Sequence, residues 1–121
     1  MKKLFVFWGK VKKGKQRGKI LGFPTANISL YKKIPEGIYA SKVKVDKKNY
    51  LAATFIGSPK TFNEKDYKAE SYILDFDKNI YGSWVTVTLF KKIRENKKFS
   101  SQHKLIEQMK KDVIKIKNIK I

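Results

Sequence analysis

The chain has 121 residues, of which 29 are Lys or Arg and 10 are Asp or Glu, and its formal net charge is +19. This length predicts one domain over residues 1–121, and the 41% hydrophobic content excludes a disordered basic tail. The chain has no cysteine and its longest apolar run near the N-terminus is Leu4 to Trp8, so we expect a cytoplasmic protein without disulfides, thiolate metal sites or a membrane span.

The strong positive charge has two interpretations. A field of this size attracts nucleic acid, anionic membranes and phosphorylated small molecules alike. Only Arg17 and Arg94 are arginines, whereas surfaces that read bases favour the planar guanidinium group. The lysines are spread along the chain in ones and twos, so a solvated lysine-rich surface is favoured over nucleic-acid binding.

Most of the chain shows the two-residue periodicity and the β-branched and aromatic residues that are typical of strands. From Ser101 the pattern changes to a helical stripe of apolar residues, and Ser100 or Ser101 can cap the first turn. We therefore predict an all-β fold, a six-stranded antiparallel Greek-key (split) β-barrel over about residues 4–95, with a C-terminal α-helix over about 101–117. The expected strands are Leu4 to Lys12, Thr25 to Ser29, Ile38 to Val45, Tyr50 to Ile56, Ala69 to Phe76 and Trp84 to Ile93.

The glycines after the first expected strand resemble a phosphate-binding loop only in part. The stretch from Gly9 to Gln16 nearly matches G-x-x-x-x-G-K-[ST], but Gln16 replaces the hydroxyl residue and no helix follows. The remaining segment, Gly14 to Lys19, is a cationic turn whose backbone amides can contact a phosphate chain. On this segment alone, an ordinary solvated hairpin loop is the favoured explanation.

Thr25 and Asn27 belong to the stretch GFPTANI. In an extended segment they project to the same side and present a hydroxyl and an amide oxygen to one point. Mg²⁺ prefers oxygen ligands and takes only one or two from a protein when nucleotide phosphates supply the others. The alternative is a turn in which both side chains bond to their own backbone.

Glu70 is the acidic residue that stands out among the expected strands. In AESYILDF, alternation places Glu70 on the same face as Tyr72, Leu74 and Phe76, which we expect to be core residues. A carboxylate on an apolar face is costly unless it is paired or functional, and it suits a general base. A strand-end glutamate that pairs with a lysine is the alternative.

Taken together, these segments resemble the riboflavin kinase family, which includes stand-alone enzymes and the C-terminal module of bifunctional riboflavin kinase/FAD synthetases. The resemblance extends over almost the whole chain, and its specificity comes from the order and spacing of the motifs. They are G-x-V-x-x-G at Gly9 to Gly14, R-G-K-x-L-G-F-P-T-A-N-I at Arg17 to Ile28, P-x-G-I-Y-A at Pro35 to Ala40, E-x-x-I-L-D-F at Glu70 to Phe76, I-Y-G at Ile80 to Gly82, I-R-E-x-K-x-F at Ile93 to Phe99 and L-I-x-Q-x-x-x-D at Leu105 to Asp112.

The resemblance implies an enzyme that transfers the γ-phosphoryl group of ATP to the 5′-hydroxyl of riboflavin, with Mg²⁺ or another divalent cation, to give FMN. We expect the chain to be a monomer, although its sequence does not determine the oligomeric state. It also implies residue roles. Glu70 is the expected base, and Thr25 and Asn27 are the expected metal ligands. Gly14, Lys19, Thr25 and Tyr81 are expected to contact the nucleotide, and Arg94, Lys97 and Phe99 the flavin.

The chain departs from the family pattern at two places. In the segment FIGSPKTF, Phe55 replaces a frequent asparagine and the proline comes one place early, so this loop receives no role in the pocket. Tyr72, two residues after Glu70, replaces a frequent histidine and receives no catalytic role. The family reading implies no specific nucleic-acid or membrane partner. The alternative from another class is a basic β-barrel that binds single-stranded nucleic acid through aromatics such as Trp8, Tyr72 and Trp84. A flavin carrier without kinase activity is a third possibility.

Overall fold

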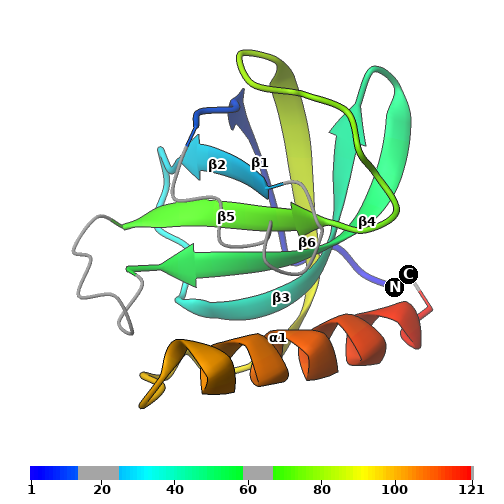
Figure 1. The fold of residues 1–121 in the computed structure, drawn as a ribbon. Coiled ribbons are helices and arrows are strands. Elements are labelled where there is room, and N and C mark those ends of the chain that lie inside the picture. The colour runs from blue at the N-terminus through cyan, green and yellow to red at the C-terminus, as the bar shows by residue number, and fades with distance from the viewer. Residues whose placement is uncertain (14–24, 59–66, 121) are drawn as a thin grey trace.

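The computed structural model describes residues 1–13, 25–58 and 67–120. In these ranges the chain forms six strands in one antiparallel sheet, followed by one helix (Figure 1). The predicted all-β fold with a C-terminal helix is confirmed. The elements are β1 (Phe5–Lys10), β2 (Thr25–Ser29), β3 (Gly37–Val45), β4 (Lys48–Gly57), β5 (Lys68–Ile73), β6 (Trp84–Arg94) and α1 (Gln102–Lys117).

The sheet has the strand order β1-β6-β3-β4-β5-β2, and all its pairs are antiparallel. Strands β3, β4 and β5 follow one another, and β6 returns to lie beside β3, which is the Greek-key arrangement. The β3–β4 turn is tight because Asp46 and Lys47 both have positive φ, of 48° and 72°, as a two-residue hairpin with native twist requires.

Two of the expected strands are shorter than predicted. β1 ends at Lys10 and not at Lys12, and β5 ends at Ile73 and not at Phe76. β5 ends early because Asp75 adopts a left-handed conformation with φ of 54°, which turns the chain out of the sheet. The prediction that Phe76 continues the alternation of β5 is therefore wrong, and Phe76 packs in the barrel interior.

The two edge strands, β1 and β2, meet where the sheet curls around. The Lys12 amide donates a hydrogen bond of 2.8 Å to the Asn27 carbonyl, and this bridge joins the ends of the two strands. Gly9 permits this approach, because a Cβ atom at residue 9 would lie 2.6 Å from Ile28 Cγ2. The bridge places the residues that follow β1 next to β2.

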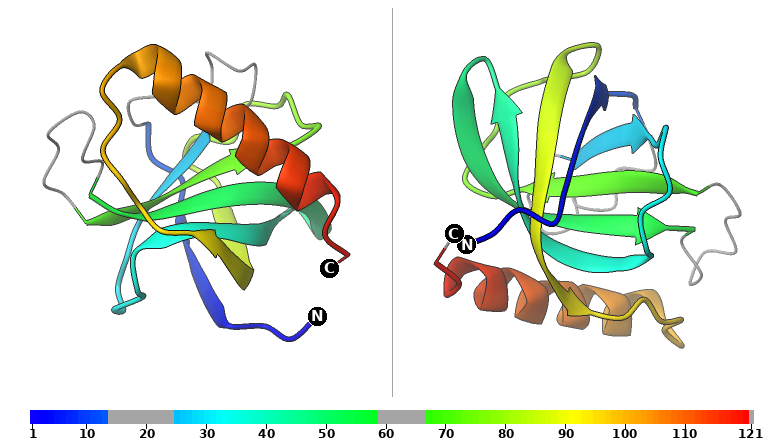
Figure 2. Two further views of the ribbon diagram at one scale, coloured as in Figure 1. Left: turned by 90° about the horizontal axis from the view of Figure 1, so that it is seen from below. Right: turned by 180° about the vertical axis from the view of Figure 1, so that it is seen from behind.

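The buried apolar residues form two clusters, one on each face of the sheet. The interior cluster includes Phe7, Ala26, Ile28, Ile56 and Ile73. The second cluster lies between the outer face and the helix α1, which crosses one side of the barrel (Figure 2). It contains Ile38, Ala40, Ala53, Phe55, Leu74, Ile93, Val113 and Ile116.

The helix α1 begins where the sequence predicts, because Ser101 is its N-cap and accepts a hydrogen bond from the Lys104 amide. Its apolar stripe buries Met109, Val113 and Ile116 against the sheet. Burying a side chain of this size stabilises the fold by about 1.5–3 kcal/mol. In the part of the chain that the structure describes, no helix is long and apolar enough to cross a membrane.

Candidate functional site

Thr25, Asn27 and Glu70 lie together on the outer face of the strand pair β2–β5. Asn27 is directly opposite Glu70 in the antiparallel register, and Thr25 is two residues away on the same face, opposite Tyr72. The alternate residues, Ala26 and Ala69 among them, point into the barrel interior, so these polar side chains point outward. Directly opposed residues have Cβ atoms about 4.5–5.5 Å apart, which brings the Asn27 amide within reach of the Glu70 carboxylate.

All three side chains are buried although they face away from the barrel interior. Thr25 is 3% exposed, Asn27 5% and Glu70 1%. The expectation that Glu70 shares a face with core residues is correct for Leu74, which belongs to the cluster under α1, and wrong for Phe76. Glu70 is thus a carboxylate on a largely desolvated outer face beside an apolar cluster.

The Thr25 hydroxyl and both polar atoms of the Asn27 side chain have no hydrogen-bond partner among the described residues. Burying a polar group without a hydrogen-bond partner costs about 1–3 kcal/mol of folding free energy. Proteins therefore seldom bury such groups unpaired unless a ligand pairs with them. A hydroxyl and an amide oxygen suit a hard cation such as Mg²⁺. Within the described ranges, no group of three or more His, Cys, Asp or Glu residues is placed to hold a metal ion.

Two residues that received no role from the sequence flank Glu70. The Tyr72 hydroxyl donates a hydrogen bond of 3.1 Å to Glu70 Oε1. Phe55 on β4 lies opposite Glu70 on the other side from Asn27, with 9% exposure. These are the two positions at which the chain departs from the family pattern near Glu70, and those departures are the signal that points to them.

The row that contains Asn27 and Glu70 continues across the sheet. Its Cα partners are Asn27 on β2, Glu70 on β5, Phe55 on β4, Ile38 on β3 and Arg94 on β6. Neighbouring strands lie about 4.8 Å apart, so Arg94 is three strand spacings, or about 14 Å along the sheet, from Glu70. The structure therefore places the expected base and the expected flavin-contacting arginine in one row.

Arg94 is fixed by the helix α1. Its Nε and Nη2 atoms donate hydrogen bonds of 2.9 and 2.8 Å to the two carboxylate oxygens of Asp112. Gln108 adds a hydrogen bond of 3.0 Å to the same carboxylate. A two-point pairing of this kind orients the guanidinium plane, and the sequence could not predict it because the pair spans the sheet and the helix.

The segment after β6 brings Lys97 and Phe99 next to Arg94. The Arg94 guanidinium carbon lies 5.7 Å from the centre of the Phe99 ring, and the Lys97 ammonium nitrogen lies 5.1 Å from it. Two cations thus surround one aromatic ring. Asn96, to which the sequence assigned no role, has a buried Nδ2 without a hydrogen-bond partner in the described part of the chain.

Tyr81 lies at the other end of the site, in the turn between β5 and β6, and is 37% exposed. The next residue, Gly82, has φ of 84° and its amide donates to the Val11 carbonyl at 2.8 Å. Val11 is followed by Lys12, whose amide contacts Asn27, so the turn lies beside the seam between β1 and β2. Gly14 and Lys19 lie outside the described residues.

Comparison with known proteins gives a consistent result. A family model described as Flavokinase, riboflavin kinase, matches residues 1–120. The trifunctional protein RibF/MnmA of Mycoplasmoides gallisepticum is 45% identical over 111 residues, which cover 89% of this chain and 17% of that protein. A bifunctional riboflavin kinase/FMN adenylyltransferase of Buchnera aphidicola is 40% identical over 114 residues, covering 90% of this chain and 36% of the relative.

The fold gives a second line of comparison. The crystal structure of riboflavin kinase from Trypanosoma brucei matches with a TM-score of 0.64 and 28% identity, covering 93% of this chain and 77% of that one. The chain spans between about a sixth and about a third of the two curated relatives above. Because the family model covers residues 1–120, the chain belongs to the riboflavin kinase family.

Proposed function

We propose that this chain catalyses transfer of the γ-phosphoryl group of ATP to the 5′-hydroxyl of riboflavin, giving FMN and ADP. The observation that carries the proposal is the register of β2 and β5, which sets Asn27 opposite Glu70 on a buried outer face, with Thr25 two residues away on the same face. A carboxylate beside two neutral oxygen donors provides a base and a cation site at one place. The chain has no cysteine, which favours a reducing compartment, and we place the reaction in the cytoplasm.

Thr25 Oγ1 and Asn27 Oδ1 would hold Mg²⁺ or another divalent cation. The bound cation would neutralise charge on the phosphates of ATP, which is the main requirement of phosphoryl transfer. The unpaired state of both oxygens among the described residues supports this assignment, since a cation would use their free lone pairs. The neutral ligand set also suits an ion whose charge is balanced by phosphate.

Glu70 would accept the proton of the riboflavin 5′-hydroxyl as its oxygen forms the new bond to the γ-phosphorus and the bond to the ADP oxygen breaks. A base in this role contributes about 10²–10⁴-fold to the rate. The hydrogen bond from Tyr72 to Oε1 holds the carboxylate in one orientation. Phe55 supplies an apolar wall that limits access of water, which would otherwise compete for the phosphoryl group.

The two substrates would approach Glu70 from opposite ends of the site, riboflavin from the end of β6 and ATP from the turn that contains Tyr81. Arg94, Lys97 and Phe99 would contact the flavin ring, and the buried Asn96 amide offers a hydrogen-bond donor to a ring carbonyl. Tyr81, with Gly14 and Lys19 of the glycine-rich segment, would contact the nucleotide. The alternative of a catalytically inactive flavin carrier does not explain why Thr25, Asn27 and Glu70 are arranged together.

The test is to incubate the purified chain with riboflavin and Mg-ATP, and separately with Mg-CTP, and to separate flavins by chromatography. We expect FMN with ATP, and none when EDTA removes the metal. Riboflavin binding without FMN formation, across Mg²⁺, Mn²⁺ and Zn²⁺ and both nucleotides, would show a flavin carrier and overturn the proposal.

A further inference from the structure

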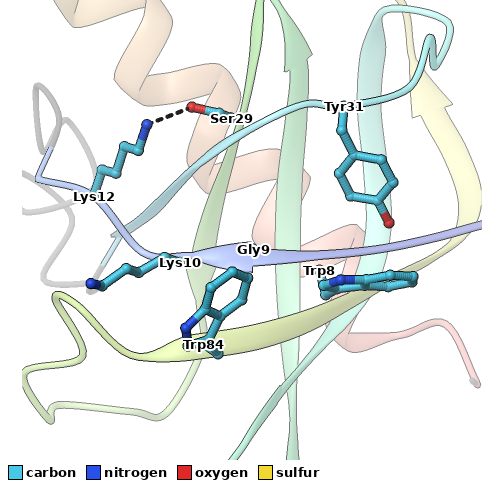
Figure 3. A pocket seen from close by; sticks show the side chains of 7 residues that line it. All are labelled: Trp8, Gly9, Lys10, Lys12, Ser29, Tyr31 and Trp84. Atoms are coloured by element: carbon cyan, nitrogen blue, oxygen red, sulfur yellow. Dashed lines mark hydrogen bonds between the residues drawn. The ribbon is translucent and has the colours of Figure 1, made fainter.

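A second feature lies on the outer face of β1, beyond the residues used by the proposed kinase site. Trp8, Tyr31 and Trp84 surround an open hollow of about 350 Å³ whose floor includes Gly9 (Figure 3). The rings of Trp8 and Tyr31 have centroids 5.4 Å apart and are tilted by 51°. Trp84 lies opposite Lys10 in the β1–β6 register, so its ring shares the outer face with Trp8.

These three aromatic side chains are unusually exposed. Trp8 is 56% exposed, Tyr31 54% and Trp84 67%, and they gather at one place from β1, β6 and the segment after β2. Single exposed apolar side chains are common on protein surfaces, but a cluster of them often marks a binding site. Tyr72, grouped with the two tryptophans in the sequence analysis, lies beside Glu70 instead and is not part of this hollow.

Two lysines line the hollow and a third lies farther along the same face. Lys10 and Lys12 line it directly, and the Lys12 ammonium donates to Ser29 at 3.0 Å. Lys44 on β3 lies two strands from Trp8 in the same row, because Trp8 is opposite Thr86 and Thr86 is opposite Lys44. Among the described residues that line the hollow, none is acidic, so its net charge comes from the two lysines.

We propose that this face binds single-stranded nucleic acid, a property beyond the proposed kinase function. Exposed rings give bases a surface to stack on, and Lys10 and Lys12 can meet the phosphates, which is the combination found where single strands bind without sequence preference. A duplex would not use the rings, because its bases are already stacked. The net charge of +19 strengthens the attraction of the strand to the whole molecule.

The hollow adjoins the kinase site but differs from it in chemistry. Ser29 on its rim lies two residues from Asn27 on the same face of β2, so the two regions are neighbours. The kinase site offers buried neutral oxygens and a carboxylate, whereas the hollow offers exposed rings and ammonium groups. Occupation of the hollow by a strand therefore needs neither Mg²⁺ nor Glu70.

The protein provides its own reporter for the test, because both of its tryptophans, Trp8 and Trp84, lie in the hollow. A single-stranded RNA of about twelve nucleotides, titrated into the intact chain, should quench tryptophan fluorescence, whereas the matching duplex should quench it weakly. With a fluorescein-labelled strand, Trp8→Ala and Trp84→Ala should each weaken binding by about 5- to 100-fold. Ile114→Ala, which truncates an exposed side chain on α1, is the control and should bind normally.

Salt dependence tests the lysines. Each phosphate of a single strand that a lysine neutralises adds about 0.7 to the steepness of log K against log salt, so Lys10→Gln should make the slope shallower by about that amount. Lys110→Gln on the exposed side of α1 should change it less. Riboflavin kinase turnover should be unchanged in Trp8→Ala, which separates failure of this inference from failure of the proposed function.

Three results would overturn the inference. The first is absence of quenching by any single strand at low salt. The second is complete displacement of the strand by Mg-ATP, which would assign the hollow to the nucleotide end of the kinase site. The third is concentration-dependent dimerisation in light scattering that Trp8→Ala abolishes, which would show that a second copy covers the rings.

Discussion

Two sets of buried hydroxyl and amide groups, one on each face of the sheet, differ in how they are paired. Inside the barrel, Ser41, Thr54 and Ser71 form a chain across β3, β4 and β5, with oxygen–oxygen distances of 2.6 and 2.8 Å. Ser41 gives its hydrogen to the Ala52 carbonyl at 2.9 Å, so Thr54 donates to Ser41 and Ser71 to Thr54. On the outer face, Thr25 and Asn27 have no such partners among the described residues.

The difference separates polar groups that support the fold from polar groups available to a ligand. The interior chain uses its hydroxyl hydrogens within the protein, so it adds to stability and has little to offer a substrate. The outer pair bears the cost of burial without a compensating hydrogen bond from the described residues. Residue type alone does not distinguish the sets, since each contains a threonine on a strand.

The largest expected effect concerns the carboxylate next to the outer pair. Glu70→Gln keeps the shape of the side chain but removes its capacity to accept a proton, so turnover should fall by about 10²–10⁴-fold. Riboflavin binding, followed by quenching of flavin fluorescence, should change little. Glu107→Gln on the exposed side of α1 is the control. A near-normal rate for Glu70→Gln would remove the assignment of the base.

The next effect concerns the outer threonine. Thr25→Val is nearly isosteric and removes one proposed metal ligand, so the Mg²⁺ concentration for half-maximal activity should rise by about 10- to 100-fold. Stability in urea should stay the same or increase, because the deleted hydroxyl has no partner among the described residues. A marked loss of stability with normal Mg²⁺ dependence would show that Thr25 is a structural residue.

The same substitution, Thr→Val, made in the interior should lower stability and leave the Mg²⁺ dependence unchanged. Thr54→Val deprives Ser41 of its donor and Ser71 of its acceptor, so the free energy of unfolding should fall by about 1–3 kcal/mol. Turnover per folded molecule and Mg²⁺ dependence should be unchanged. If Thr54→Val altered Mg²⁺ dependence as much as Thr25→Val, the division between the two sets would not hold.

The smallest effect is a pH dependence of the interior. Burial, with smaller contributions from Tyr67 and Glu95, raises the pKa of Tyr39 above its ordinary value of 10.0, and its hydroxyl donates to the Pro35 carbonyl at 2.6 Å. Above pH 10 the unfolded chain therefore loses this proton before the folded one does, and stability falls with rising pH. Below that pH this contribution is constant.

Urea midpoints measured from pH 8 to 11 test this expectation. The decline above pH 10 should be less steep in Tyr39→Phe than in the unsubstituted chain, because the residue that titrates is absent. An identical decline in both proteins would show that Tyr39 ionises equally in the folded and unfolded states.

Much of the fold was predictable because its determinants are local. Alternation located the strands, and Ser101 marked the start of α1. Alternation also showed that Thr25 shares a face with Asn27, but it could not show which face is the barrel interior. The answer depends on how the sheet curls and where α1 packs. Only the structure therefore shows that the face bearing Glu70 is the outer face.

The partners of the site residues were not predictable for the same reason. The placement of Phe55 beside Glu70 and the pairing of Arg94 with Asp112 join segments far apart in the chain. The end of β5 was missed because the single residue that turns the chain there, the left-handed Asp75, lies inside an apolar run. The roles of the site residues stay predictions until the variants are measured.

With the proposed roles of Glu70 and Arg94, the row from Asn27 to Arg94 would fix the distance between the reacting hydroxyl of the substrate and its flavin ring. Two whole strands, β4 and β3, stand between Glu70 and Arg94, and hydrogen-bonded strands keep an almost constant spacing. Rearrangement of loops cannot change that length. A flavin analogue whose polyol tether is one carbon shorter should therefore dock its ring normally yet leave its terminal hydroxyl short of the carboxylate, so the molecule would select tether length as well as ring chemistry.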